Sequence, residues 1–184
     1  KMITLTITGG AFRGRKIRAV PNEVTRYTPE RVRLALFSIL GQHCDIAACR
    51  FCDLCAGSGV VGIEALSRGA TFAEFYDMSR LSVKTIIATV QEFGLKDRAQ
   101  VYCRNLLTAR GKPSLGAEVV FIDPPFHTEI AEKFFLTFAN EPAWMLKNAL
   151  LMIEYSRTVP DITGFVKIGE YRYGTVFLNL FRKE

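Results

Sequence analysis

No hydrophobic run in this sequence approaches the length of a membrane span, and no segment is repeated or of low complexity. A helix needs about 20 consecutive apolar residues to cross a bilayer, so we expect no membrane anchor. Residues 1–6 also lack an apolar stretch followed by a small-residue cleavage site, which argues against a secretory signal. What remains is a chain of 184 residues, 49% of them hydrophobic, which is enough for one domain with a full core.

The cysteine count is odd, so the sequence lacks a complete set of disulfide pairs. The cysteines are Cys44, Cys49, Cys52, Cys55 and Cys103. Scattered cysteines of this kind fit a reducing cytoplasm better than a disulfide framework, and we expect a cytoplasmic protein. The run from Cys49 to Cys55 resembles a metal-binding spacing, but residues 50–54 read as a strand. A strand rises about 3.3 Å per residue and would hold the outer thiols roughly 20 Å apart, so we expect core cysteines and no metal.

Acidic residues are scarce at the N-terminal end of the chain. Residues 1–40 carry eight basic and two acidic side chains, whereas the rest of the chain carries 16 of each. The whole net charge of +6 therefore lies in this first segment, and its arginines suit phosphate groups through their fork of donors. We predict a basic N-terminal extension that contacts nucleic acid; the alternative is a solvated basic surface. The expected phosphate contacts are Arg13, Arg15, Lys16, Arg26, Arg31 and Arg33.

Within this extension, residues 3–8 and 16–20 predict a strand pair, and Thr28 predicts a helix cap before Pro29. From residue 50 onward, apolar strands alternate with amphipathic helices, which predicts an α/β doubly wound parallel sheet. The two last strands are too close for a crossover and must form an antiparallel hairpin at Tyr173-Gly174. The seven strands are expected at 50–54, 71–76, 99–103, 118–122, 149–154, 165–171 and 174–181, and the helices at 59–68, 80–93 and 128–139.

A glycine-rich loop follows the first of these parallel strands. Gly57, Gly59 and Gly62 have the G-x-G-x-x-G spacing, and Asp77 ends the second strand, as a dinucleotide fingerprint requires. An NAD-linked enzyme must therefore be weighed. Asp53 decides against it, because a carboxylate just before the glycines would repel a pyrophosphate. S-adenosylmethionine carries an ammonium and a sulfonium and no phosphate, so we predict this methyl donor as the cofactor.

The expected cofactor-binding residues span the loop and the ends of the neighbouring strands. Asn105 follows the strand at 99–103, where a side-chain amide can meet an adenine edge; an ordinary loop asparagine is an equal alternative. The full set is Asp53, Ala56, Gly57, Ser58, Gly59, Asp77, Met78, Asn105 and Leu106.

The turn Asp123-Pro124-Pro125-Phe126 follows a buried apolar strand. Two prolines cannot extend a central strand, because each lacks the amide hydrogen that the ladder needs. The turn would present a carboxylate, the carbonyl of Pro124 and the aromatic ring of Phe126, which together seat a flat, amino-bearing base. The alternative is an ordinary strand-ending turn. If the chemistry is right, Asp53 and Asp123 must open into one hollow at the carboxyl edge of the sheet.

Together these motifs resemble the bacterial 16S ribosomal RNA guanine-N2 methyltransferases. The quoted segments are Gly10, residues 13–16, 26–37, 53–59 and 62–70, and the turn at 123–126. The resemblance implies a Rossmann-like class I methyltransferase domain at 41–184, preceded by an RNA-contacting extension at 1–40. It also implies a monomer that uses S-adenosylmethionine and acts on 16S ribosomal RNA or the small subunit. Asp123 and Pro124 would orient the target amine, and Phe126 would stack on the base. Tyr27 departs from the family, which usually has proline there.

Two alternatives stay open. One is an amino-methyltransferase acting on adenine N6, although such enzymes more often carry asparagine where Asp123 stands. The other is an RNA-binding assembly factor without catalysis, against which the intact glycine loop and Asp-Pro-Pro-Phe turn argue.

Overall fold

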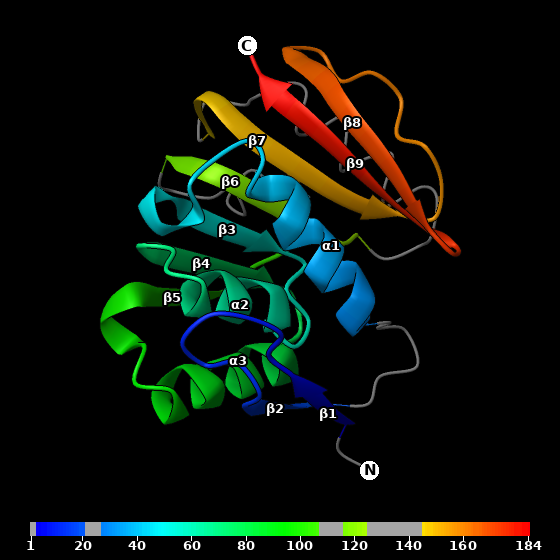
Figure 1. The fold of residues 1–184 in the computed structure, drawn as a ribbon. Coiled ribbons are helices and arrows are strands. Elements are labelled where there is room, and N and C mark those ends of the chain that lie inside the picture. Colours follow the sequence, from blue (N-terminus) through cyan, green and yellow to red (C-terminus); the bar gives the residue numbers. More distant parts are fainter. Residues whose placement is uncertain (1–2, 21–26, 107–115, 125–144) are drawn as a thin grey trace.

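The computed structural model describes residues 3–20, 27–106, 116–124 and 145–184. Seven strands of this part form one sheet in the order β5-β4-β3-β6-β7-β9-β8 (Figure 1). They are β3 (Arg50–Leu54), β4 (Phe72–Asp77), β5 (Ala99–Cys103), β6 (Ala117–Ile122), β7 (Met145–Tyr155), β8 (Phe165–Tyr173) and β9 (Val176–Lys183).

The strands from β3 to β7 pair in parallel, whereas β9 is antiparallel to both β7 and β8. This confirms the predicted Rossmann-like sheet with its closing hairpin. Since β3, β4 and β6 are parallel neighbours, their carboxyl ends lie at one edge of the sheet, where ligands of such folds bind. The predicted strand at 149–154 begins earlier, at Met145, and the hairpin turns at Gly174 and Thr175.

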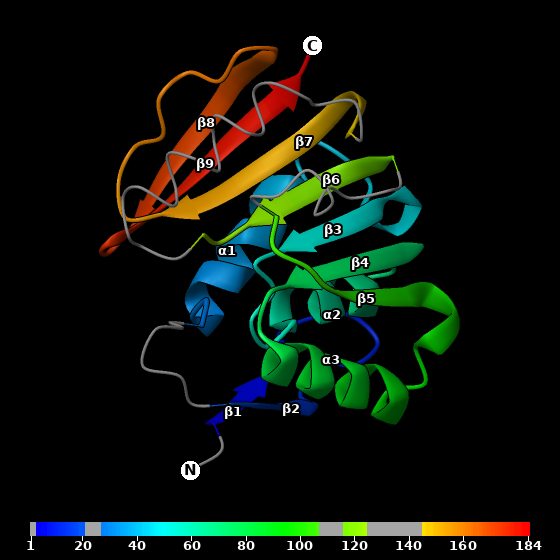
Figure 2. The same ribbon diagram turned by 180° about the vertical axis from the view of Figure 1, so that it is seen from behind.

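Among the described residues, three helices cover one face of the sheet (Figures 1 and 2): α1 (Glu30–Leu40), α2 (Val60–Ser67) and α3 (Arg80–Glu92). Short 3-10 helices, η1 (Ile46–Ala48) and η2 (Lys96–Arg98), precede β3 and β5. The helices predicted at 59–68 and 80–93 are thus found within one residue at each end. The helix predicted at 128–139 lies outside the described residues.

The predicted cap at Thr28 is wrong by one residue. Pro29, in an extended conformation, is the N-cap residue of α1, and no side chain caps the helix. The carbonyl of Pro29 accepts from the amides of Val32 and Arg33 at 2.9 and 3.0 Å, so the helical hydrogen bonds begin there. Thr28 is buried instead, and its carbonyl serves another partner, described below.

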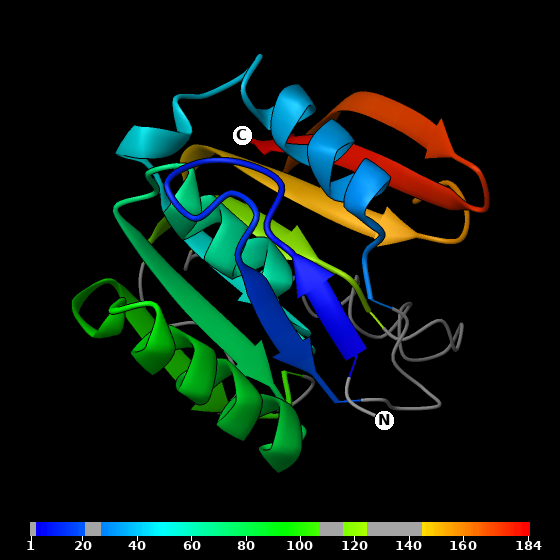
Figure 3. The ribbon, with the colours of Figure 1, turned by 60° about the horizontal axis from the view of Figure 1, so that its bottom comes forward.

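The N-terminal strands β1 (Ile3–Thr6) and β2 (Lys16–Ala19) form an antiparallel pair beside α3 (Figure 3). Ile7 and Ile17 are buried in the same hydrophobic cluster as the apolar face of α1 and the strand residue Phe51. The described part of residues 1–40 therefore packs onto the core of the sheet.

A second hydrophobic cluster includes Cys52 and Leu54 of β3. The prediction of core cysteines is confirmed for Cys49 and Cys52, but Cys55 is half-buried and Cys103 is exposed. Within the four described ranges, no group of three or more histidine, cysteine or acidic side chains is arranged to hold a metal ion. No helix of the described chain is long and apolar enough to span a bilayer.

Candidate functional site

A small hollow opens at the carboxyl edge of β3 and β6. Its enclosed volume is about 20 Å³, room for roughly one water molecule. The lining residues are Tyr27, Thr28, Asp53, Cys55, Ala56, Gly57, Ser58, Val60, Val61, Phe121 and Asp123. Asp53 and Asp123 therefore share one hollow, as the sequence required. A nucleoside-sized ligand fits only if the hollow widens.

Asp53 stands in β3, one residue before its end, and is 1% exposed. Its Oδ2 accepts a hydrogen bond from the amide of Gly62 at 2.9 Å. Burial raises the pKa of Asp53 well above its usual range; the Gly62 hydrogen bond opposes this shift and the Asp77 carboxylate adds to it. A nearby cation would reverse the shift, so this carboxyl favours a positively charged ligand.

The turn between β3 and α2 brings backbone close to the hollow. Cys55, Gly57 and Gly59 all have positive φ angles, of 60°, 55° and 73°. A Cβ atom on Gly59 would also lie only 2.9 Å from a side-chain carbon of Ile86. Glycine at position 59 is therefore required both by its backbone conformation and by the approach of α3.

Gly62 has a different role from the two glycines of the turn. It lies inside α2, where a Cβ atom would meet the ring of Phe75 at 2.3 Å. Its missing side chain lets α2 approach β4 closely, and this contact carries the Gly62 amide to Asp53. The third glycine of the motif is thus a packing residue, as in other glycine fingerprints of parallel sheets.

Asp77 ends β4 and fastens the turn to the neighbouring strand. Its Oδ2 accepts from the Gly57 amide and its Oδ1 from the Ser79 amide, both at 2.8 Å. Burial raises the pKa of Asp77, while these two hydrogen bonds act in the opposite direction. A carboxylate oxygen can accept more than one hydrogen bond, so Asp77 retains acceptor capacity for hydroxyl groups of a ligand.

Asp123 follows β6, and its amide donates to the Leu54 carbonyl at 3.5 Å. The acidic side chains of this edge also affect the thiol of Cys55. Burial raises its pKa first, and the carboxylates of Asp123, Asp77 and Asp53 raise it further. Asp77, Asp53 and Asp123 thus come from three adjacent parallel strands at one edge of the sheet, and Asp53 and Asp123 line the same hollow. Pro124 is buried beside them.

Some predicted site residues do not line the hollow. Met78 and Asn105 are exposed after β4 and β5, at the same edge of the sheet, while Leu106 is buried in the second hydrophobic cluster. Their cofactor roles stay predictions. Pro125 and Phe126 lie outside the described residues.

Tyr27 and Thr28 line the hollow although the sequence motifs gave no sign of it. The Tyr27 hydroxyl donates to the carbonyl of Val20. Burial and the Asp77 carboxylate raise the pKa of Tyr27. Residues 26–37 belong to the segments that carry the family resemblance, but that resemblance indicated RNA contact there and not a place in the wall of this hollow.

Arg33 was wrongly predicted as a phosphate contact. It is 1% exposed, and its Nε lies 3.3 Å from Oε2 of Glu64, which is fully buried. Its remaining donors reach the carbonyls of Thr28 and Thr6 at 2.7 and 2.5 Å. The buried carboxylate of α2 draws this arginine inward, because neither charge tolerates burial alone.

Other predicted phosphate contacts are exposed but lie apart: Arg13, Arg15, Lys16 and Arg31. Arg15 packs on the ring of Phe93 at 3.7 Å and donates to the carbonyl of Glu92, the last residue of α3. Arg31 stands at the start of α1, and its guanidinium lies near Gly174 in the turn between β8 and β9. The loop between β1 and β2 thus lies beside α3, whereas the start of α1 lies near the turn between β8 and β9 (Figure 1). Arg26 lies outside the described residues.

Comparisons with known proteins identify a family and several solved structures with the same fold. The profile of a family described as conserved hypothetical protein 95 matches residues 5–182. Ribosomal RNA small subunit methyltransferase D of Haemophilus influenzae is 32% identical over 181 residues, covering 96% of this chain and 92% of that protein. The Escherichia coli protein yhhF has a TM-score of 0.82 at 30% identity, covering 98% of both chains. SMU.776, solved with S-adenosylhomocysteine, shares the fold, with a TM-score of 0.72 at 12% identity over 98% of this chain and 56% of that one.

Proposed function

This chain belongs to the bacterial 16S ribosomal RNA methyltransferase family, and from that premise we propose that it methylates the exocyclic N2 amine of a guanine in 16S ribosomal RNA. The methyl donor is S-adenosylmethionine. The observation that carries the proposal is the single hollow lined by Asp53, Asp123 and the turn at Gly57.

The donor site fits this cofactor better than it fits a dinucleotide. Asp53 is a buried carboxyl with a raised pKa, and the Asp77 carboxyl stands close enough to contribute to that shift. A cation relieves this arrangement, whereas a pyrophosphate would add further negative charge. S-adenosylmethionine, when bound, supplies an electrophilic methyl group on a positively charged sulfur. Asp53 favours its ammonium group, directly or through water, and Asp77 accepts from its ribose hydroxyls.

The target amine is oriented by the turn after β6. The Asp123 carboxylate and the Pro124 carbonyl accept its two N–H hydrogens, which leaves the nitrogen lone pair available for the methyl carbon. Holding the two reactants in line supplies most of the acceleration in such a displacement. The methylated amine is acidic and releases a proton to Asp123 or to water. Phe126 stacks on the base, in the manner of other enzymes that act on unpaired nucleotides.

The RNA contacts come from the basic N-terminal segment. Arg13, Lys16 and Arg31 present exposed cationic side chains, whereas Arg33 serves the fold. Contacts to phosphate are weakened by salt, because each one releases condensed counterions. The exposed cations lie beside α3 and at the start of α1, so the bound RNA extends along the helical face, beyond the hollow that takes the target base.

The test is transfer of a radiolabelled methyl group to RNA from cells that lack this protein. Naked 16S ribosomal RNA and purified small subunits serve as separate substrates, and the labelled nucleoside is identified after digestion. We expect N2-methylguanosine. Labelled N6-methyladenosine would replace the guanine assignment with the adenine alternative. Failure of the chain to bind S-adenosylmethionine would favour an assembly factor without catalysis.

A further inference from the structure

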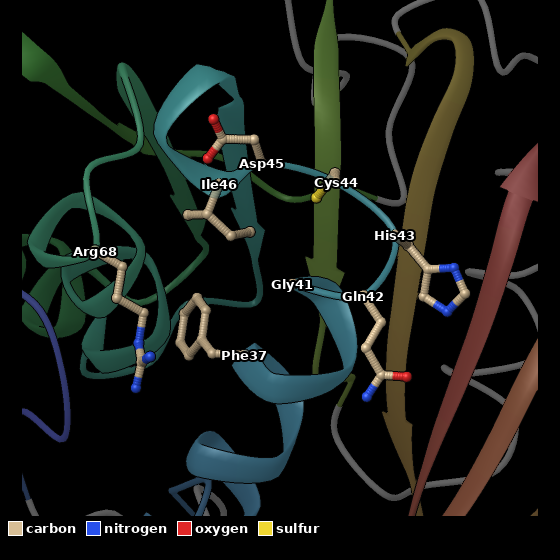
Figure 4. A pocket seen from close by; sticks show the side chains of 8 residues that line it. All are labelled: Phe37, Gly41, Gln42, His43, Cys44, Asp45, Ile46 and Arg68. Carbon is tan, nitrogen blue, oxygen red and sulfur yellow. The ribbon is translucent and has the colours of Figure 1, made fainter.

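A second hollow, larger than the first, lies between the end of α2 and the segment that links α1 to η1 (Figure 4). It is open and has a volume of about 650 Å³. Arg68, which lines it, already donates to Glu64 at 2.8 Å and to Thr8 at 3.1 Å. Asp45, which also lines it, accepts from the Ala47 amide at the start of η1. These two charges are matched within the fold, so neither is left to select a ligand.

Exposed arginines without a matching carboxylate lie elsewhere, around the turn between β8 and β9. Arg172 stands next to the end of β8, and Arg31 stands at the start of α1. Both side chains are exposed, and within the described part of the chain neither forms an ion pair. This turn therefore presents positive charge to the solvent.

The pairing of the strands places the turn at the same edge of the sheet as the catalytic hollow. Because β9 is antiparallel to β7, it begins where β7 ends: Tyr155 pairs with Phe177, which in turn pairs with Arg172. Because β7 is parallel to β6, this is also the edge at which Asp123 follows β6. Figure 1 shows the turn on the side toward which β3 and β7 point. From β6 to β8 there are three strand spacings of about 4.8 Å, or roughly 14 Å.

The guanidinium of Arg172 is fixed by two contacts and still has free donors. Its Nε donates to the carbonyl of Gly174 at 3.1 Å, and its central carbon lies 5.6 Å from the centre of the Phe177 ring. The Nε bond uses one of the five N–H donors of the group, so the fork formed by the terminal nitrogens stays available. A guanidinium that packs on a ring and presents this fork suits a phosphate group.

Two more arginines surround the turn. Arg31 approaches from the face that α1 covers, and a Cβ atom on Gly174 would lie only 2.9 Å from its Nη2. Arg172 lies on the opposite face with its strand partner Phe177, because the residues on either side of Phe177 are buried in the cluster that includes α1. Arg157 is exposed just after β7, with its guanidinium 5.7 Å from the centre of the Tyr155 ring.

The carboxyl edge of the sheet thus has an acidic end and a basic end. Asp53 and Asp123 line the hollow, whereas the arginines lie around the turn. Glu170 of β8 does not cancel their charge, because it pairs with Lys167 and accepts from Thr158 at 3.1 Å. A nucleotide has the matching polarity, since its base carries an amine and its backbone carries a phosphate.

We propose that the turn between β8 and β9 is a second RNA-binding element, where Arg31, Arg157 and Arg172 bind phosphates of the nucleotides that flank the methylated base. This inference rests on the proposed function, which places the target base beside Asp123. With its base in the hollow and its flanking phosphates at the turn, the RNA strand follows the carboxyl edge of the sheet. Contacts of this kind position a nucleic acid without reading its sequence.

The experiment is filter binding of 16S ribosomal RNA, transcribed in vitro, to Arg172→Ala at several salt concentrations. We expect affinity to fall about tenfold near 0.1 M salt, and the slope of log affinity against log salt to fall by about 0.7–1, because one phosphate contact no longer releases its counterions. Arg172→Lys keeps the charge without the fork and should retain most of the slope. Lys147→Ala is the control. It removes an exposed charge near the start of β7, at the opposite edge of the sheet, and should change neither quantity.

A second measurement uses the natural chain and does not depend on whether a variant folds. The protein is cross-linked by light to 16S ribosomal RNA that contains 4-thiouridine, and the cross-linked peptides are mapped after trypsin digestion. Trypsin releases the turn within residues 173–182, and we expect cross-links on this peptide. Cross-links elsewhere in the chain and none on 173–182 would overturn the proposal. So would natural affinity and slope in a folded Arg172→Ala, and the basic edge would then suit an acidic protein segment instead of RNA.

Failure of the proposed function gives a different result from failure of this inference. Neither filter binding nor cross-linking needs methyl transfer. A chain that forms no N2-methylguanosine, but loses RNA affinity in Arg172→Ala, would contradict the guanine assignment and support the RNA contact at the turn. A chain that forms N2-methylguanosine, but binds RNA equally well in Arg172→Ala, would keep the proposed function and overturn this contact.

Discussion

Asp53 is a carboxylate that the fold buries close to a second acidic group, Asp77. Because burial raises its pKa in the folded state, the proton it retains stabilises the fold at low pH. That stabilisation is lost as the pH rises through the raised pKa. At neutral pH an ionised Asp53 therefore lowers the free energy of unfolding, and a bound cation would offset this loss. If the proposed cofactor binds here, this site loses stability in the free protein and gains affinity for a positively charged ligand.

We predict that Asp53→Asn weakens S-adenosylmethionine binding about tenfold, while raising the free energy of unfolding at neutral pH by about 1 kcal/mol. The amide oxygen can still accept from Gly62, so only the charge is lost. Calorimetric titration and urea unfolding at several pH values measure the two effects. Asp161→Asn, at an exposed position, is the control and should change neither. Unchanged affinity in Asp53→Asn would remove its proposed role.

In the proposed reaction, Asp123 acts on the methyl acceptor, whereas Asp53 acts on the methyl donor. We predict that Asp123→Ala keeps cofactor binding and lowers methyl transfer by about a hundredfold or more, because the target amine loses an oriented acceptor. Asp123→Asn retains one carbonyl acceptor, so its rate of methyl transfer should lie between those of the natural protein and Asp123→Ala. Single-turnover transfer, measured alongside cofactor affinity, separates chemistry from binding. Full activity in Asp123→Ala would exclude it from the mechanism.

At the scale of elements, α2 owes its place on the sheet to a missing side chain. We predict that Gly62→Ala destabilises the protein by about 1–3 kcal/mol, since the added methyl would overlap the ring of Phe75 at 2.3 Å. Urea unfolding measures the loss. Gly41→Ala is the matched control, because its φ of −64° suits alanine and its nearest contact would be 3.2 Å. Equal losses in the two variants would contradict the packing role of Gly62.

A buried ion pair joins the N-terminal hairpin, α1 and α2. We predict that Glu64→Gln destabilises the fold by about 3–5 kcal/mol, because Arg33 is left with a buried and uncompensated charge. The double variant Arg33→Met/Glu64→Gln should recover much of that loss. Thermal and urea unfolding of the single and double variants measure this coupling. Glu170→Gln, which breaks an exposed pair with Lys167, is the control and should have little effect. If the single and double variants were equally stable, the loss in Glu64→Gln would not come from an uncompensated charge on Arg33.

The sequence predicted the strand–turn–helix unit around Asp53 closely, because its signals are local: an apolar strand, glycines at set spacing and an amphipathic helix. The predicted helix cap at Thr28 was wrong because a serine or threonine before a proline is a common helix start, whereas here Pro29 itself is the N-cap residue. Arg33 misled for another reason. Its partner Glu64 lies 31 residues away, and nothing near Arg33 in the sequence indicates a buried carboxylate.

At the scale of the whole molecule, exposed cations of the N-terminal segment lie beside α3 and at the start of α1. We predict that Arg31→Ala weakens binding of 16S ribosomal RNA and reduces the slope of log affinity against log salt by about 1. Filter binding at several salt concentrations measures both. Arg98→Ala is the control, because its guanidinium already serves the carbonyls of Leu66 and Ala70. A slope unchanged by Arg31→Ala would show that this residue meets no phosphate.

Asp77 holds the turn at Gly57 in place by accepting hydrogen bonds from backbone amides, and these bonds form without a ligand. The turn that lines the pocket is consequently held in place before a ligand binds, so less of its conformational freedom is lost on binding. Access of a ligand depends instead on the side chains that line the hollow. Tyr27 is a bulky one, and its hydroxyl donates a hydrogen bond to the carbonyl of Val20. Because the hollow now has room for about one water molecule, we expect this side chain to move when the methyl donor binds.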